Sequence, residues 1–261
     1  MHKIGLIIAD HFQMLAISTL TVFEFANMAT GKAFYQPVVY SEFGGTVRSS
    51  SGIGVDSLPL SDDTQVDSWL VAGVLTPVEE PASAGIVHFL QTTALQARRI
   101  AGVCTGAFVL AQAGLLDKKR ATTHWAHARS LLQLHPDIQL EDDRIFIIDD
   151  RVWTSAGMTA GLDMALGMVE KDLGAEIARA VAHNLVMNQR RSGGQTQHSE
   201  MLALAPRSDR LQSALEYARS NLSKALAVEL LADAVHLSAR QLSRLFRQET
   251  GKSPAKAIEG L

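Results

Sequence analysis

The chain contains a single cysteine, Cys104, at a position where a nucleophile could act. The apolar run 100–103 before it has the length and composition of a buried parallel strand, and the run 107–111 after it has a helical pattern. Gly102 and Gly106 flank the cysteine, and such small neighbours suit a sharp strand-to-helix turn where a Cβ would clash. The pattern predicts a nucleophile elbow, at which the N–H groups of the following helix favour a thiolate or another anion.

A cysteine nucleophile also needs a proton shuttle, and His124 is the candidate base. Its neighbour Trp125 allows a different role for the pair, in which the imidazole and the indole line a ligand pocket. A lone cysteine is also often a small buried hydrophobe, and a loop histidine is often bonded only to backbone. No acidic residue is evident from the sequence as a partner for Cys104 and His124.

We therefore favour a pocket that binds a small molecule without converting it, because the partner acid of Cys104 is missing. Backbone N–H groups at the elbow would suit a carboxylate. The residues expected to line this pocket are Gly73, Val74, Cys104, Thr105, Gly106, His124 and Trp125. The alternatives are a Cys-dependent hydrolase, hydratase or amidotransferase-like enzyme that uses Cys104 and His124, and a dimeric scaffold without a ligand. The histidines show no metal-ligand spacing with Cys104, so we expect no metal and no cofactor.

A second group of residues, near the end of the chain, suits nucleic-acid binding. A short helix at 227–235, a turn at 236–238 and a second helix at 239–250 form a predicted helix-turn-helix. Leu242, Leu245 and Phe246 would form the buried face of the second helix. The capping residue and the other face have types that bond phosphates and base edges: Ser238, Arg240, Gln241, Ser243, Arg244 and Arg247. The alternative is a small helical dimerisation module with solvated charges.

The charge of the chain is unevenly distributed along its 261 residues. Residues 206–261 carry 9 Lys and Arg against 6 Asp and Glu, whereas residues 1–205 carry 15 against 21. A basic tail on an acidic body is compatible with nucleic-acid binding. One cysteine excludes an intrachain disulfide and fits the reducing cytoplasm. We find no signal-peptide pattern and no apolar run long enough to span a bilayer, so we expect no membrane partner.

The elements that must position these residues alternate between strand and helix over residues 1–188. Such alternation implies a mostly parallel sheet covered on both faces, in a three-layer α/β domain. Residues 189–205 are polar and rich in Gly and Gln, which predicts a linker. The expected strands are 3–9, 35–41, 69–73, 100–103, 138–140, 144–148 and 151–154, and the expected helices include 15–29, 77–97, 107–114, 159–174 and 175–188. A small all-α domain is expected at 206–261.

The whole chain resembles a known pairing of two domains. Residues 238–254 resemble the first helix-turn-helix of AraC-type transcriptional regulators. Residues 1–188 resemble the PfpI-like, class I glutamine-amidotransferase-like (flavodoxin-like) domain of the GlxA-type subgroup of those regulators. The matching pieces are GVCTG at 102–106, ATTHW at 121–125, TSAG at 154–157 and TAG at 159–161. The resemblance to PfpI-type enzymes implies an assisting carboxylate from the segment after the first strand, but residues 13–20 of this chain hold no acidic residue.

The resemblance implies a homodimer that binds double-stranded operator DNA and a small effector, such as an amino acid or a related nitrogen compound. It implies that the protein regulates transcription in response to that effector. AraC-type regions normally hold two helix-turn-helix units joined by a long helix. This chain ends at Leu261, where the joining helix would begin, so we expect the second unit to be absent from it.

Overall fold

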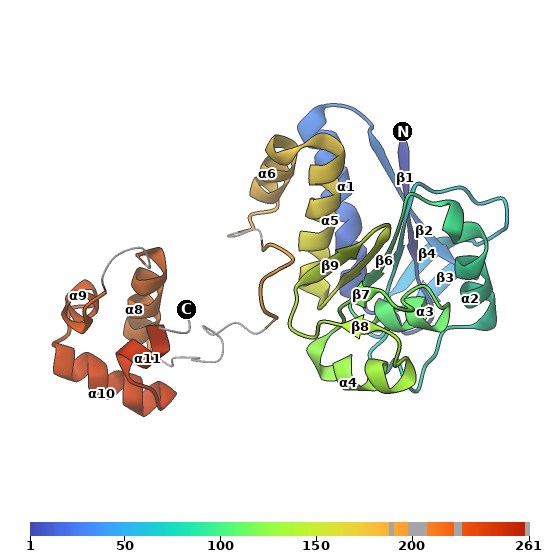
Figure 1. Ribbon diagram of the computed structural model, residues 1–261. Coiled ribbons are helices and arrows are strands. Elements are labelled where there is room, and N and C mark those ends of the chain that lie inside the picture. Colours follow the sequence, from blue (N-terminus) through green and yellow to red (C-terminus); the bar gives the residue numbers. More distant parts are fainter. Residues whose placement is uncertain (188–190, 198–207, 222–225, 259–261) are drawn as a thin grey trace. The chain divides into compact units, whose positions relative to one another are not determined.

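The chain forms two compact units, each with its own hydrophobic core (Figure 1). The computed structural model describes residues 1–187, 191–197, 208–221 and 226–258. We call Met1–Gln197 the α/β unit and His198–Leu261 the helical unit. Within the described ranges, no helix is long and apolar enough to cross a membrane.

In the described residues, a sheet of eight strands forms the centre of the α/β unit. Its order is β3-β4-β2-β1-β5-β6-β10-β9. The strands from β4 to β10 in this order run parallel, and β3 and β9 pair antiparallel at the two edges. The strands are β1 (His2–Ile7), β2 (Tyr35–Ser41), β3 (Phe43–Arg48), β4 (Gly54–Pro59), β5 (Ser68–Val71), β6 (Arg99–Val103), β9 (Phe146–Asp149) and β10 (Val152–Ser155). A separate pair consists of β7 (Arg120–Ala121) and β8 (Gln139–Leu140).

Helices cover both faces of this sheet, which confirms the predicted three-layer α/β class (Figure 1). The fully buried runs of β5 and β6 agree with parallel strands covered on both sides. On one face lie α1 (Ser18–Thr30), α5 (Met158–Leu173) and α6 (Ala175–Asn184), and on the other lie α2 (Ala84–Gln91) and α3 (Gly106–Gln112). The helix α4 (Trp125–Leu134) contributes Leu131 to the same core as α2 and α3.

The range 77–97 was expected to be one helix and instead holds only α2 and a 3₁₀ turn at Thr93–Gln96. Pro77 and Pro81 have no N–H to donate, which disfavours a continuous helix through this segment. The helix starts after Ser83, whose side chain accepts a hydrogen bond from the N–H of Ile86. Residues 77–83 are therefore free to form the wall of a cavity described below.

A buried ion-pair network joins the start of β6 to the end of α5. The Asp172 side chain is 1% exposed and accepts hydrogen bonds from Arg99 at 2.5 and 2.8 Å. It also accepts from the Tyr35 hydroxyl at 2.9 Å and pairs with Arg98. Burial lowers the pKa of Arg99 to about 10 and raises the pKa of Tyr35 to about 12, so both stay protonated at neutral pH.

The helical unit contains α8 (Asp209–Ser220), α9 (Val228–Ala234), α10 (Ala239–Thr250) and α11 (Pro254–Ile258). Leu242 and Phe246 of α10 are buried against α8 and α9, as the sequence pattern predicted, whereas the third residue of the predicted face, Leu245, is partly buried. Ser238 and Gln241 form a reciprocal capping box at the start of α10, and Gly251 ends it with φ of 70°.

The structure describes residues 191–197 of the range 189–205 that was expected to be a linker. Residues 191–197 pack onto the α/β unit and belong to it. The contacts involve side chains of α5 and of the segment between β8 and β9. The polar composition suggested a linker here, but these polar groups are bonded to the body of the unit. Residues 188–190 and 198–207 lie outside the described residues.

Candidate functional site

The predicted strand-to-helix corner is present, and Cys104 stands on it with φ of 56°. A left-handed conformation at a non-glycine residue costs about 1–3 kcal/mol and persists only where the surroundings hold it. The Cys104 N–H donates to Ser155 Oγ at 3.4 Å, and its carbonyl accepts from Thr123 Oγ1 at 3.1 Å. The last residue of β10 and the loop before α4 therefore fix the corner.

Close contact between backbones explains the glycines around this corner. A Cβ at Gly73 would overlap the hydroxyl of Thr105, and a Cβ at Gly106 would overlap the carbonyl oxygen of Val71. Thr105 Oγ1 donates to the carbonyl of Val74 at 2.6 Å and joins the elbow to the segment after β5. The structure thus brings together four of the expected pocket residues: Gly73, Val74, Thr105 and Gly106.

The Cys104 thiol is sealed rather than open, because the residue is only 2% exposed and packs in the main core. Burial raises its pKa to about 11, and the smaller opposing effect of hydrogen bonds from Thr105 does not compensate. The sequence suggested that the elbow would favour a thiolate. The structure keeps the thiol neutral, because desolvation outweighs the nearby N–H groups.

We expect the Cys104 thiol to react with iodoacetamide at pH 8 at least about a hundredfold more slowly than free cysteine, whose pKa is about 8.5. The thiolate is the reacting species, and burial both suppresses it and blocks access. Mass spectrometry of the intact chain measures the rate. The same chain in urea is the control and should react at the free-cysteine rate; fast modification of the folded chain would contradict the sealed elbow.

His124 caps α4 instead of bonding Cys104. Its Nδ1 accepts the N–H of Ala126 at 3.2 Å, and its ring stacks on Trp125 with centroids 5.5 Å apart. Burial, and then the charge of His127, lower the pKa of His124, so it is neutral at physiological pH. No hydrogen bond links the side chains of Cys104 and His124 in the part of the chain that the structure describes.

The segment expected to supply an assisting acid contributes an amide instead. The side-chain oxygen of Gln13 is buried and has no hydrogen-bond partner among the described residues. The backbone N–H of Gln13 donates to the carbonyl of Gly73 at 2.9 Å, which places Gln13 beside the elbow. The catalytic arrangement of thiolate, base and acid is therefore not assembled by the described residues.

An open cavity of about 410 Å³ lies next to the elbow, at the carboxyl ends of β1, β2 and β5. This is the edge of a parallel sheet at which α/β proteins commonly bind ligands. Val74 and Thr105 line it, but the other five expected pocket residues do not. Sequence reasoning missed most of its wall, which includes Asp10, Glu42, Phe43, Glu80, Ile86 and Phe108.

One face of α10 carries the residues expected to bind DNA. Arg240, Arg244 and Arg247 are exposed, and no hydrogen bond or ion pair engages their side chains among the described residues. They line a surface groove of about 740 Å³ together with Ser238, Gln241, Ser243, Gln248, Ser253 and Pro254. The side-chain oxygen of Gln241 is occupied by the cap, where it accepts from the N–H of Ser238 at 2.9 Å.

The described residues contain no group of three or more His, Cys, Asp or Glu side chains that could hold a metal ion.

Two family models match the chain, one for each unit. Residues 2–171 match the DJ-1/PfpI family, and residues 219–258 match bacterial regulatory helix-turn-helix proteins of the AraC family. A crystal structure of an AraC family transcriptional regulator from Pseudomonas putida superposes on 71% of this chain and 100% of its own, with a TM-score of 0.63 and 23% identity. An isonitrile hydratase of Pseudomonas putida is 38% identical over 52% of this chain and 58% of that protein.

Two regulators match almost the whole chain. The HTH-type transcriptional regulator GbdR of Pseudomonas aeruginosa (strain UCBPP-PA14) is 30% identical over 97% of this chain and 70% of its own length. The HTH-type transcriptional regulator GlxA of Rhizobium meliloti (strain 1021) is 31% identical over 95% of this chain and 78% of its own length. The chain therefore belongs to the GlxA-type family of DNA-binding transcriptional regulators, in which a DJ-1/PfpI domain is followed by an AraC-type helix-turn-helix.

Proposed function

We propose that this regulator binds double-stranded DNA through the arginine face of α10 and responds to a small cationic effector held in the cavity beside the elbow. The observation that carries the DNA-binding half is the groove with Arg240, Arg244 and Arg247 on one exposed face of a capped helix. Guanidinium groups on one helix face are suited to base edges and phosphates of a major groove.

The test of DNA binding is selection of fragments from a random duplex pool by the full chain, followed by titration at several salt concentrations. We expect one enriched sequence family and an affinity that falls with salt, because phosphate contacts release counterions. Recovery of an unenriched pool would reject sequence-specific binding. We also propose that the protein acts as a homodimer, since helix-turn-helix regulators usually bind paired half-sites; sedimentation with and without the selected DNA measures this.

The chemistry of the cavity supports a cationic ligand. Glu42 and Asp10 make no hydrogen bond or ion pair with described residues, and no Lys or Arg is among the described residues that line the cavity. The Glu42 carboxylate packs against Gly85 at the start of α2, where a Cβ would overlap it. Phe43 is 85% exposed at the same cavity, where its ring is available to a cation.

A further carboxylate in the cavity is held ionised. Glu80 accepts a hydrogen bond from Thr76 and lies 2.6 Å from Nδ1 of His11, and these hydrogen bonds lower its pKa. Apolar side chains such as Ile86 and Phe108 form the rest of the wall. Apolar walls with few oriented polar groups are typical of small-molecule sites.

We expect benzylammonium to raise the melting temperature of the full chain by at least twice as much as benzoate at equal concentration. The two probes share an apolar body and differ in the sign of their charge, so the comparison isolates the cavity carboxylates. Glu42→Gln should reduce the difference, whereas Glu79→Gln, an exposed neighbour outside the cavity, should preserve it. Equal shifts from both probes in the unmodified chain would reject a cation site.

We propose that the chain does not use Cys104 for turnover, because its thiol is buried and its pKa is raised to about 11. Cys104→Ala should therefore bind the selected DNA with the affinity of the unmodified chain, as measured by titration. Any turnover that the unmodified chain shows should persist in this variant.

A further inference from the structure

We propose that residues 191–197 form a strap that couples the loop beside the elbow, residues 122–125, to the point where the chain leaves the α/β unit. The strap ends at Gln197, and His198 is the first residue of the helical unit. The coupling would let a change at the elbow, where Thr105 lines the effector cavity, reach the DNA-binding unit through the chain itself. It goes beyond the proposed function, which does not say how the two units communicate.

The first contact of the strap is a charged one with a buried partner. The backbone N–H and Nε of Arg191 donate to the two carboxylate oxygens of Asp163 at 2.9 and 2.8 Å. Asp163 lies in α5 and its side chain is fully buried. Arg191 also donates to Thr159 Oγ1 at 3.0 Å, so the start of the strap is held at three polar atoms of α5.

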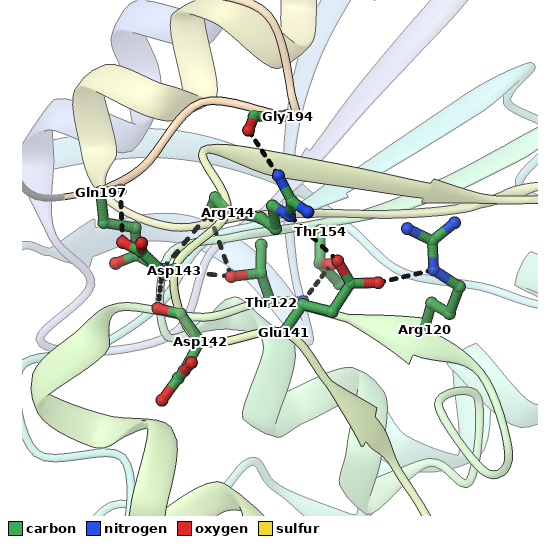
Figure 2. Close-up of polar contacts among 9 residues, drawn as sticks. All are labelled: Arg120, Thr122, Glu141, Asp142, Asp143, Arg144, Thr154, Gly194 and Gln197. Atoms are coloured by element: carbon green, nitrogen blue, oxygen red, sulfur yellow. Dashed lines mark hydrogen bonds and ion pairs between the residues drawn. The ribbon is translucent and has the colours of Figure 1, made fainter.

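The middle of the strap lies along the segment that leads into β9. The N–H of Ile145 donates to the carbonyl of Gln195 at 3.1 Å, and Arg144 donates to the carbonyl of Gly194 at 2.5 Å. Figure 2 shows Arg144 between this carbonyl and Glu141, which in turn bonds Arg120. Gly193 lies so close to the carbonyl oxygen of Phe146 that a Cβ at position 193 would overlap this oxygen.

The end of the strap is held by the side chain of Gln197, which bonds backbone groups of two segments; Figure 2 shows its contacts with the segment that contains Asp142. Its Nε2 donates to the carbonyls of Asp142 at 2.7 Å and Thr123 at 2.9 Å. Its Oε1 accepts the N–H of Trp125 at 3.0 Å, and its own N–H donates to Asp143 at 2.9 Å. A primary amide is the side chain that can donate and accept in this way at once.

Thr123 connects these contacts of Gln197 to the elbow. Its carbonyl accepts from Gln197, and its hydroxyl donates to the carbonyl of Cys104 at 3.1 Å. The next residue back, Thr122, is fixed by its N–H to Thr154 Oγ1 at 2.8 Å. The loop is thus bonded on one side to the elbow and on the other to the strap. A displacement of the loop must either carry the strap with it or break these bonds.

The forward test compares Gln197→Ala with Gln195→Ala in the full chain by amide hydrogen exchange. The Gln195 side chain is exposed and makes no described contact, so it is a matched control in the same segment. Loss of several hydrogen bonds in Gln197→Ala should speed exchange at residues 191–197 about tenfold or more, and at 123–126 as well. Faster exchange in the strap alone, or in neither segment, would overturn the coupling.

The reverse test perturbs the loop from the elbow side. Thr123→Val removes the hydroxyl that bonds Cys104 but keeps the carbonyl that bonds Gln197. Exchange at residues 191–197 should rise several-fold, whereas Thr21→Val, which loses a hydroxyl bond within α1, should leave it unchanged. Melting temperatures of both variants identify any general destabilisation, and a strap unaffected in folded Thr123→Val would overturn the proposal.

The regulatory consequence is measured on a DNA fragment that the unmodified chain has selected. Coupling between sites typically amounts to fivefold or more in affinity, so Gln197→Ala should change the apparent Kd by about that factor while Gln195→Ala does not. Equal affinities would show that the strap does not control DNA binding. If the unmodified chain selects no DNA, the proposed function fails, and the exchange experiments still decide the coupling.

Discussion

Replacing Arg244 with alanine is expected to weaken binding of the full chain to its selected DNA by about 10- to 100-fold. Arg244 lies on the exposed face of α10, one turn after Arg240 and beside Arg247. A guanidinium that reads a base edge with two hydrogen bonds contributes about 1–3 kcal/mol of discrimination. The affinity for the selected sequence should therefore fall more than the affinity for random duplex, which titration against both measures.

Arg129→Ala provides the charge-matched control for Arg244→Ala. Arg129 is an exposed arginine of α4 in the α/β unit, and its replacement by alanine removes the same charge as Arg244→Ala. The Arg129→Ala variant should bind the selected DNA with the same affinity as the unmodified chain. Equal loss of selected and random binding in Arg244→Ala would instead assign this residue to phosphate contact, and unchanged binding would remove α10 as the reading helix.

Asp172→Asn is expected to lower the free energy of unfolding of the α/β unit by about 3–5 kcal/mol. The Asp172 carboxylate is nearly inaccessible and neutralises the buried guanidinium of Arg99. An amide has no charge, so Arg99 would remain buried without compensation beside Trp153, over whose ring it lies at 5.4 Å. Urea unfolding followed by the fluorescence of the buried tryptophans measures the loss.

Asp62→Asn serves as the control for Asp172→Asn, because Asp62 is exposed and makes no described contact. Its unfolding free energy should change by less than about 0.5 kcal/mol. A similarly small change in Asp172→Asn would mean that Arg99 finds water or another partner, and that the network does not stabilise the fold.

The sequence predicted the fold well where local pattern and packing agree. The apolar run 100–103 with its flanking glycines became β6 and the elbow, because few conformations bury such a run and turn it so sharply. The capped helix 239–250 was equally predictable, since Ser238 and Gly251 mark its ends. The prediction of one helix over 77–97 was wrong, because the apolar residues of this segment suggested a continuous helix that Pro77 and Pro81 disfavour.

The sites were harder to predict because they depend on contacts between distant segments. Nothing in the spacing of Cys104 and His124 shows that the imidazole caps α4 or that the thiol is sealed. The cavity gathers residues from β1, β2, β5, α2 and α3, which only the sheet order brings together. Residues 191–197 fell within the predicted linker because composition does not reveal the carbonyls and carboxylates of the α/β unit to which they bond.

The burial of Cys104 has a practical consequence for spectroscopy. It is the sole cysteine of the chain, and its sulfur lies out of reach of solvent. A thiol introduced at an exposed position, such as Gln195 in the strap or Gln248 on α10, would be the preferred target of a maleimide dye or a nitroxide. Pairs of such labels can report distances across the two units without first deleting a native side chain from the core.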